Sequence, residues 1–116
     1  GADVVYQAAG GSGLGVLQAA LDAGRYAIGN DSDQNGLHPT AVLASALKNV
    51  GSAAYHGIEL FLKGELKPGS SVKVDLSNDG VSLAINEDLV PSKYVAQIDG
   101  FRQKVVAGDI VVNSAF

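Results

Sequence analysis

Apolar and polar residues alternate along the chain in blocks that predict strands and helices in turn. Residues 3–9 form a short apolar run that stops at the glycine-rich segment 10–13, which predicts a strand buried on both faces. Leucine and alanine then recur at helical spacing over 14–23, and Gly24 is a suitable helix end. Residues 25–29 predict a second strand. This order of strand, glycine-rich turn, helix and strand predicts a βαβ unit with parallel strands.

The second half of the chain continues the alternation. A polar loop is expected at 30–40, and the apolar segment 41–47 is compatible with strand or helix, of which we favour the strand. Residues 50–64 predict an amphipathic helix with one apolar stripe, made of Ala54, Ile58, Phe61 and Leu62. We expect the tyrosines to lie in or at the edge of the core, namely Tyr6, Tyr26, Tyr55 and Tyr94.

The last third of the chain predicts a hairpin, a helix and a strand. Residues 72–76 and 81–85 flank an Asp-Gly turn and predict a hairpin. A helix is expected at 91–107, with proline in its first turn, and a final strand at 109–112. Together these elements predict an α/β fold, a mostly parallel sheet flanked by helices.

Composition narrows the possible functions. The chain has 116 residues, enough for one domain, with 47% apolar and 17% charged residues and a net charge of −4. An acidic chain of this kind is not expected to bind nucleic acid, which requires clustered basic charge. The absence of cysteine excludes disulfides and thiol catalysis. The chain contains no methionine and begins at Gly1, directly before a predicted strand, so we expect it to be a piece of a longer protein.

The segments able to carry chemistry are few. The 10–15 segment lacks the spacing of a dinucleotide fingerprint or a phosphate-binding loop, but its backbone N–H groups could hold a polar ligand at a helix start. Residues 31–36 imitate a calcium loop, yet Val42 stands where the closing glutamate should be. Asp31 therefore either caps its loop or accepts hydrogen bonds from a ligand. Lys48 either extends into solvent or donates to a ligand, and no catalytic set or cofactor-binding motif is evident.

Several of these segments are similar to one known family. Residues 1–13 (GADVVYQAAGGSG), 27–34 (AIGNDSDQ) and 42–50 (VLASALKNV) resemble the C-terminal part of the basic membrane protein (BMP) family. Residues 78–84 (NDGVSLA) resemble the hairpin that follows in that family. The family consists of bacterial substrate-binding lipoproteins of ABC transporters, best known for purine nucleosides.

The resemblance implies a two-lobed type I periplasmic-binding-protein fold, of which residues 1–116 would be the C-terminal fragment. The first lobe, or a second chain in its place, would complete the cleft that holds a purine nucleoside or related ligand. By the same resemblance, Asp31 would accept the ribose hydroxyls and Lys48 would donate to the ribose or base. Ala9, Gly10 and Gly11 would line the cleft. Asn30 departs from the family, in which many members have valine at this position.

The resemblance also implies a setting for the protein. The partner would be an ABC transporter permease, and the protein would face the periplasm or the outer side of the cytoplasmic membrane, lipid-anchored through an upstream cysteine. No catalytic activity, cofactor or metal would be needed. Two alternatives remain open at this point: a ligand-sensing regulator on the same scaffold, or a sugar- or nucleotide-using enzyme domain in which Asp31 acts as general base.

Overall fold

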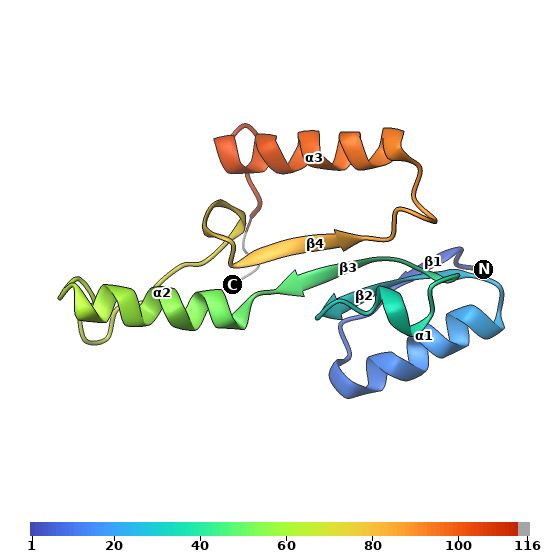
Figure 1. Ribbon diagram of the computed structural model, residues 1–116, viewed down its shortest axis with the longest axis horizontal. Helices are drawn as coiled ribbons and strands as arrows, with labels where there is room; N and C mark the ends of the chain where they lie inside the picture. Colours follow the sequence, from blue (N-terminus) through green and yellow to red (C-terminus); the bar gives the residue numbers. More distant parts are fainter. Residues whose placement is uncertain (114–116) are drawn as a thin grey trace.

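The computed structural model describes residues 1–113 and contains a four-stranded sheet with helices on both sides (Figure 1). The strands lie side by side in chain order: β1 (Val4–Tyr6), β2 (Tyr26–Asp31), β3 (Val42–Lys48) and β4 (Val81–Ile85). The first three are parallel, and β4 runs antiparallel to β3. This arrangement confirms the predicted α/β class with a mostly parallel sheet, including the strand that we favoured at 41–47.

The packed core lies between helix α1 (Gly13–Asp22) and the sheet. It consists of four side chains that are at most 6% exposed: Leu17, Ala20, Ala27 and Val42. Leu17 and Ala20 are three residues apart, so they face the sheet from one side of the helix. The helix is followed by Gly24 at φ +60°, a backbone conformation that favours glycine. The predicted βαβ unit is therefore formed as expected.

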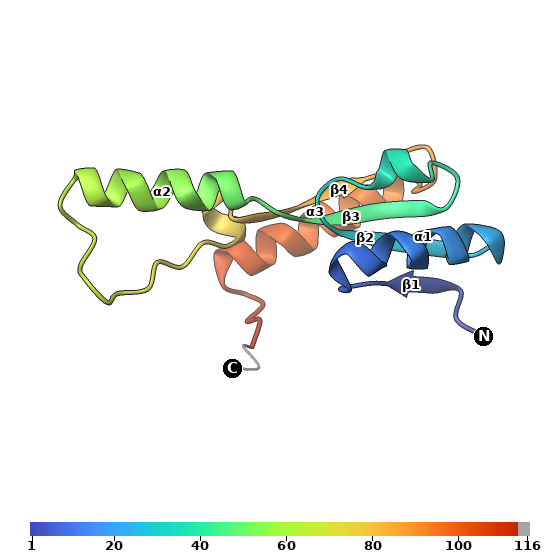
Figure 2. The same cartoon turned by 90° about the horizontal axis from the view of Figure 1, so that it is seen from below.

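Helix α2 (Val50–Leu62) continues past the end of the sheet, and Figures 1 and 2 show that it extends away from the other elements. None of its residues is buried, and Phe61 and Leu62 are 68% and 78% exposed. The predicted helix is therefore present, and its apolar stripe is exposed within the described chain. All four tyrosines are also exposed, contrary to the expected core positions.

Helix α3 (Ser92–Ala107) lies alongside β4 on the side of the sheet opposite α1 (Figure 1). It matches the predicted helix at 91–107, but none of its residues is buried. Among residues 1–113, no helix has both the length and the apolar character that crossing a membrane requires.

The predicted hairpin is only half formed, because residues 72–76 are not a strand. A short 3₁₀ helix, η3 (Leu76–Asn78), stands at its turn. The Asp75 carboxylate accepts hydrogen bonds from the Ser77 N–H and hydroxyl, and Asn78 accepts one from the Asp75 N–H. These local side-chain bonds satisfy the backbone in a capped turn, which competes with strand pairing.

The expected strand at 109–112 is also absent. Gly108 ends α3 at φ +83°, and the Ile110 N–H bonds back to the Lys104 carbonyl at 3.2 Å. The chain thus turns back on the helix end.

The polar loop predicted at 30–40 is confirmed in part. Strand β2 extends to Asp31, and a 3₁₀ helix, η2 (Asn35–Leu37), interrupts the loop.

Candidate ligand site at the carboxyl edge of the sheet

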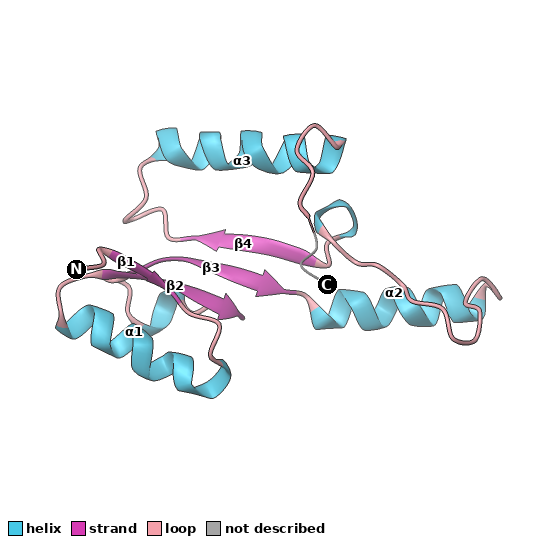
Figure 3. Cartoon of the chain, turned by 180° about the vertical axis from the view of Figure 1, so that it is seen from behind, coloured by secondary structure: helices cyan, strands magenta, loops and turns pink. Residues whose placement is uncertain are grey.

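The carboxyl ends of β1, β2 and β3 meet at one edge of the sheet, which we call the carboxyl edge. Figure 3 shows the arrowheads of β2 and β3 pointing to it. Asp31 is the last residue of β2 and Lys48 the last residue of β3, and Asp31 pairs with Leu47 in the sheet register. The turn at residues 9–11 follows β1 and leads into α1. The residues that the resemblance assigns to the ligand site thus lie at this edge, namely Ala9, Gly10, Gly11, Asp31 and Lys48.

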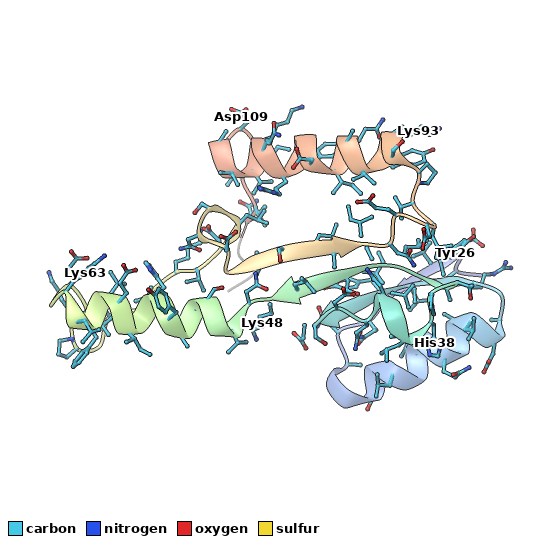
Figure 4. All side chains as sticks on the ribbon, in the orientation of Figure 1. Tyr26, His38, Lys48, Lys63, Lys93 and Asp109 are labelled. Atoms are coloured by element: carbon cyan, nitrogen blue, oxygen red, sulfur yellow. The ribbon has the colours of Figure 1, made fainter. Side chains whose placement is uncertain are left out.

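The two charged side chains at the carboxyl edge face solvent. Asp31 is exposed and adopts φ +68°, a left-handed conformation that is uncommon for a residue other than glycine. Lys48 is exposed where β3 passes into α2 (Figure 4). No ion pair within residues 1–113 includes either side chain. A carboxylate and an ammonium group are therefore presented at one edge with both heads accessible to a ligand.

The glycine-rich turn presents backbone rather than side chains. Gly10 adopts φ +56°, and nothing lies within 4 Å of where a Cβ would stand on Gly10 or Gly11. The Ser12 N–H donates to the Ala9 carbonyl at 3.2 Å, which closes the turn as a 3₁₀ helix, η1 (Gly10–Ser12). Helix α1 starts directly after it. Open backbone beside a helix start suits a polar ligand group.

A largely buried network of polar side chains links the three parallel strands next to the carboxyl edge. Gln34 Oε1 accepts hydrogen bonds from Gln7 Nε2 at 3.2 Å and from the Asn30 N–H at 3.0 Å. Ser45 Oγ accepts from the Gln34 N–H at 3.0 Å and donates to Asn35 Oδ1 at 2.9 Å. Gln7 and Ser45 are 5% and 0% exposed. The network holds the ends of β1, β2 and β3 together.

Sequence reasoning missed this network, although the sequence contains its signal. Gln7 and Ser45 are polar residues within runs otherwise suited to buried strands. A buried polar side chain needs a hydrogen-bond partner, so polar residues at such positions predict a network. Gln34 ends the segment at residues 27–34 (AIGNDSDQ), in which the resemblance assigns a ligand role to Asp31 alone.

The oxygen-rich loop at 31–36 is explained by its own hydrogen bonds. Asp33 Oδ1 accepts from the Asn35 N–H at 3.0 Å, an arrangement typical of a polar turn. Within the described part of the chain, no three acidic, histidine or cysteine side chains gather where a metal ion could bind. Loop capping thus accounts for the Asp33 carboxylate.

Asn30, the position that departs from the family pattern, contacts the neighbouring strand. Its Oδ1 accepts a hydrogen bond from the Tyr6 hydroxyl at 2.9 Å. Tyr6 is 57% exposed, so the bond lies at the surface of the carboxyl edge. The asparagine adds a second link between β1 and β2, next to Asp31.

The chain leaves the sheet and returns to it beside the carboxyl edge. Asn49, between β3 and α2, donates from its N–H to the Gly80 carbonyl at 3.0 Å and from Nδ2 to the Asp79 carbonyl at 2.7 Å. The start of α2 and the entry into β4 are thus joined.

A charged turn precedes this entry into β4. Hydrogen bonds from Ser77, together with Lys73 at 3.2 Å, lower the pKa of Asp75 to about 2.

Comparison with known proteins identifies the family. The family model described as ABC transporter substrate-binding protein PnrA-like matches residues 1–115. Basic membrane protein D of Borreliella burgdorferi (strain JD1) is 41% identical over 92 residues, which cover 77% of this chain and 27% of that protein. Basic membrane protein A of Borreliella afzelii is 30% identical over 115 residues, covering 97% and 35%. The chain thus spans about a third of the length of the curated relatives that it matches.

Solved structures agree with the fold. A transcriptional activator of the comK gene from Bacillus halodurans superposes with a TM-score of 0.84 at 27% identity, covering 96% of this chain and 39% of that one. An ABC transporter solute-binding protein from Aeropyrum pernix K1 matches with a TM-score of 0.78 at 21% identity, covering 100% and 42%. Since the family model matches nearly the whole chain, this chain belongs to the PnrA-like family of ABC transporter substrate-binding proteins.

Proposed function

We propose that the chain is the C-terminal portion of a two-lobed, extracytoplasmic solute-binding component of an ABC importer. Its ligand would be a purine nucleoside or a related molecule, held in a cleft between the lobes. Family membership over residues 1–115 supports solute binding, and the share of the relatives that it spans supports a further lobe. Ligands of open α/β sheets bind at the carboxyl ends of parallel strands, where the candidate residues lie.

The observation that carries this proposal is the meeting of Asp31, Lys48 and the turn at residues 9–11 at the carboxyl edge. In the proposed complex, the Asp31 carboxylate accepts hydrogen bonds from two vicinal ribose hydroxyls, and the Lys48 ammonium group donates to the ribose or base. The turn lines the cleft through its open backbone. Charge-assisted hydrogen bonds of this kind contribute about 1.5–3 kcal/mol each.

The proposed role needs binding and release rather than chemistry. The protein would deliver its ligand to a transporter permease, and closure of two lobes would sequester that ligand. We propose a place in the periplasm or at the outer face of the cytoplasmic membrane, with a lipid anchor on a cysteine upstream of this chain. Sequencing the N-terminus of the full-length protein tests this placement. We expect a signal peptide that is followed directly by a lipid-modified cysteine.

A ligand-sensing regulator is the second candidate. The support is the structural likeness to the Bacillus halodurans protein, which is described as a transcriptional activator. Both roles would use the carboxyl edge to bind a small molecule, so binding assays do not separate them. Cell fractionation does separate them. A transport role predicts that the protein is recovered with the membrane. A regulatory role predicts that it is recovered with a partner that contacts DNA or with a signalling protein.

Calorimetric titration of inosine and adenosine into the full-length protein tests the proposed site. We expect Asp31→Ala to weaken binding by about 2–4 kcal/mol, because both ribose hydroxyls lose their acceptor. Asp33→Ala is the matched control and should cost much less, since Asp33 Oδ1 already caps Asn35. If both substitutions proved equally harmless, the assignment of Asp31 would be wrong.

Lys48 and chelation separate a sugar site from a calcium site. We expect Lys48→Ala to weaken nucleoside binding, and a chelator to leave the wild-type affinity unchanged. A loop without a closing glutamate should bind calcium only at about millimolar levels or weaker. Loss of nucleoside binding in chelator, with Lys48→Ala silent, would contradict the ribose role of Asp31.

A further inference from the structure

A continuous chain of hydrogen bonds joins the two segments of the candidate site. The Ala9 N–H donates to Gln7 Oε1 at 2.9 Å, and Gln7 Nε2 donates to Gln34 Oε1 at 3.2 Å. The same Gln34 oxygen accepts the Asn30 N–H at 3.0 Å. One end of this chain is the turn at residues 9–11, and the other is the residue before Asp31.

The direction of each bond is dictated by chemistry. A backbone N–H can only donate, so the Ala9 and Asn30 amides require the carbonyl oxygens of Gln7 and Gln34 to face them. The amide group of Gln7 is then left to donate to Gln34. The pair therefore has one defined order of donors and acceptors, and a reversed order would leave a backbone N–H without an acceptor.

Two glycines make room for the two carboxamides. A Cβ on Gly29 would stand 2.8 Å from Gln34 Oε1 and 2.7 Å from Ser45 Oγ, and a Cβ on Gly13 would collide with the Gln7 carboxamide. Both glycines have ordinary backbone angles, since neither is among those with positive φ. Close approach of the glutamines, rather than a special backbone conformation, is therefore the reason that glycine suits these positions.

We propose that Gln7 and Gln34 are positioning residues, which set the turn at residues 9–11 and the Asp31 carboxylate relative to each other for ligand binding. The inference rests on the proposed ligand site at the carboxyl edge. Gln7 is 5% exposed and neither glutamine needs to touch the ligand. Their contribution comes from holding two binding segments in one geometry before the ligand arrives.

A matched pair of substitutions tests the order of donors and acceptors. Gln34→Glu keeps an acceptor for both the Gln7 amide and the Asn30 N–H. Gln7→Glu instead places a carboxylate oxygen against the Gln34 oxygen, so the link is broken. Both substitutions add the same charge at nearly the same place. In calorimetric titrations of inosine into the full-length protein at pH 7.5, we expect at least tenfold weaker binding for Gln7→Glu and less than threefold for Gln34→Glu.

Acidification adds a readout that lost packing would not change. A protonated carboxyl group can donate, so it restores the link to Gln34, and burial raises the pKa of the introduced group toward neutral. Inosine affinity of Gln7→Glu should therefore recover relative to wild type between about pH 7.5 and pH 5. Gln34→Glu should show no such recovery. The wild-type protein, titrated at the same pH values, corrects for the pH response of the rest of the protein.

The outcomes distinguish this inference from the proposed function. If wild type binds inosine and both variants bind alike at every pH, the positioning role is wrong and the proposed site stands. If wild type binds no nucleoside, the proposed nucleoside ligand is wrong, and hydrogen exchange of the Asn30 amide then tests whether Gln7 and Gln34 couple the two segments. Faster exchange at pH 7.5 in Gln7→Glu than in Gln34→Glu supports the coupling, and equal exchange overturns it.

Discussion

The two halves of the chain differ in how their apolar residues are packed. In residues 1–48, α1 covers the parallel strands, and Leu17 and Val42 are completely buried. Helices α2 and α3 contain no buried residue, although α2 has an apolar stripe as regular as that of α1. The same kind of sequence pattern thus ends in a closed core in one region and in an uncovered helix face in the other.

The difference teaches that amphipathic periodicity predicts a helix, and that a partner must also be present for its face to be buried. The chain exposes 8061 Å², whereas a compact monomer of 11.8 kDa should expose about 5,900 Å². The exposed surface includes large apolar side chains of α2, among them Ile58, Phe61 and Leu62. A contiguous exposed apolar patch of this kind marks a contact site. The carboxyl edge lies at the boundary of the two regions, where β3 passes into α2 (Figure 1).

The largest expected effect concerns the closed core. Leu17→Ala should reduce the free energy of unfolding by about 2–5 kcal/mol, because it leaves a cavity between α1 and the sheet. Phe61→Ala on α2 is the control and should change stability by at most about 0.5 kcal/mol in residues 1–116 alone, at protein concentrations too low for self-association. Urea denaturation measures both. Equal losses for the two variants would show that the packing difference between the halves is not real in solution.

The exposed apolar face of α2 should cause the chain to self-associate. We expect residues 1–116 alone to self-associate, and Ile58→Glu with Leu62→Glu on α2 to weaken that association at least tenfold in sedimentation experiments. Ala96→Glu with Gln97→Glu adds the same two charges to exposed positions of α3 as a control. A monodisperse monomer before any substitution would count against an uncovered contact surface on α2.

The smallest expected effect concerns the capped turn before β4. Because the folded-state pKa of Asp75 is lowered to about 2, from an ordinary value of about 3.9, its carboxylate stabilises the fold above about pH 4. This contribution should be lost as the pH falls from about 4 toward 2. Asp75→Asn should therefore be less stable than wild type at pH 7 in thermal unfolding, and the difference should shrink across that window.

Asp88→Asn provides the control for Asp75, since Asp88 is exposed and also carries one negative charge. It should show little loss at pH 7. A stability difference for Asp75→Asn that stays constant down to pH 2 would mean that its hydrogen bonds to Ser77 do not favour the charged carboxylate in the folded protein.

The parallel strands and helices could be predicted from sequence because their signals are local. The run before Gly10, the spacing of Leu17 and Ala20, and the glycine after α1 each specify structure within a few residues. The strand predicted at 72–76 is absent for an equally local reason. Asp75 and Asn78 form a capping arrangement, which stabilises a turn there instead of a strand. Alternating apolar residues alone did not reveal this competition.

The candidate site was predictable only in part. The position of Asp31 and Lys48 after apolar strands placed them at one edge, because parallel strands share a carboxyl end. The glutamine link beneath that edge joins residues 27 positions apart, and such a pairing depends on the sheet register. No single-sequence pattern encodes that register, so the link emerged only from the structure.

One measurement tests the central claim, that Asp31 binds the ribose hydroxyls, most directly. Inosine and 2′,3′-dideoxyinosine, which lacks both hydroxyls, are titrated calorimetrically into the full-length wild-type protein and Asp31→Ala. We predict that wild type prefers inosine by at least about 100-fold, or about 2.8 kcal/mol, and that Asp31→Ala removes most of this preference. A preference that is the same in both proteins would contradict the assignment of the ribose to Asp31 at the carboxyl edge.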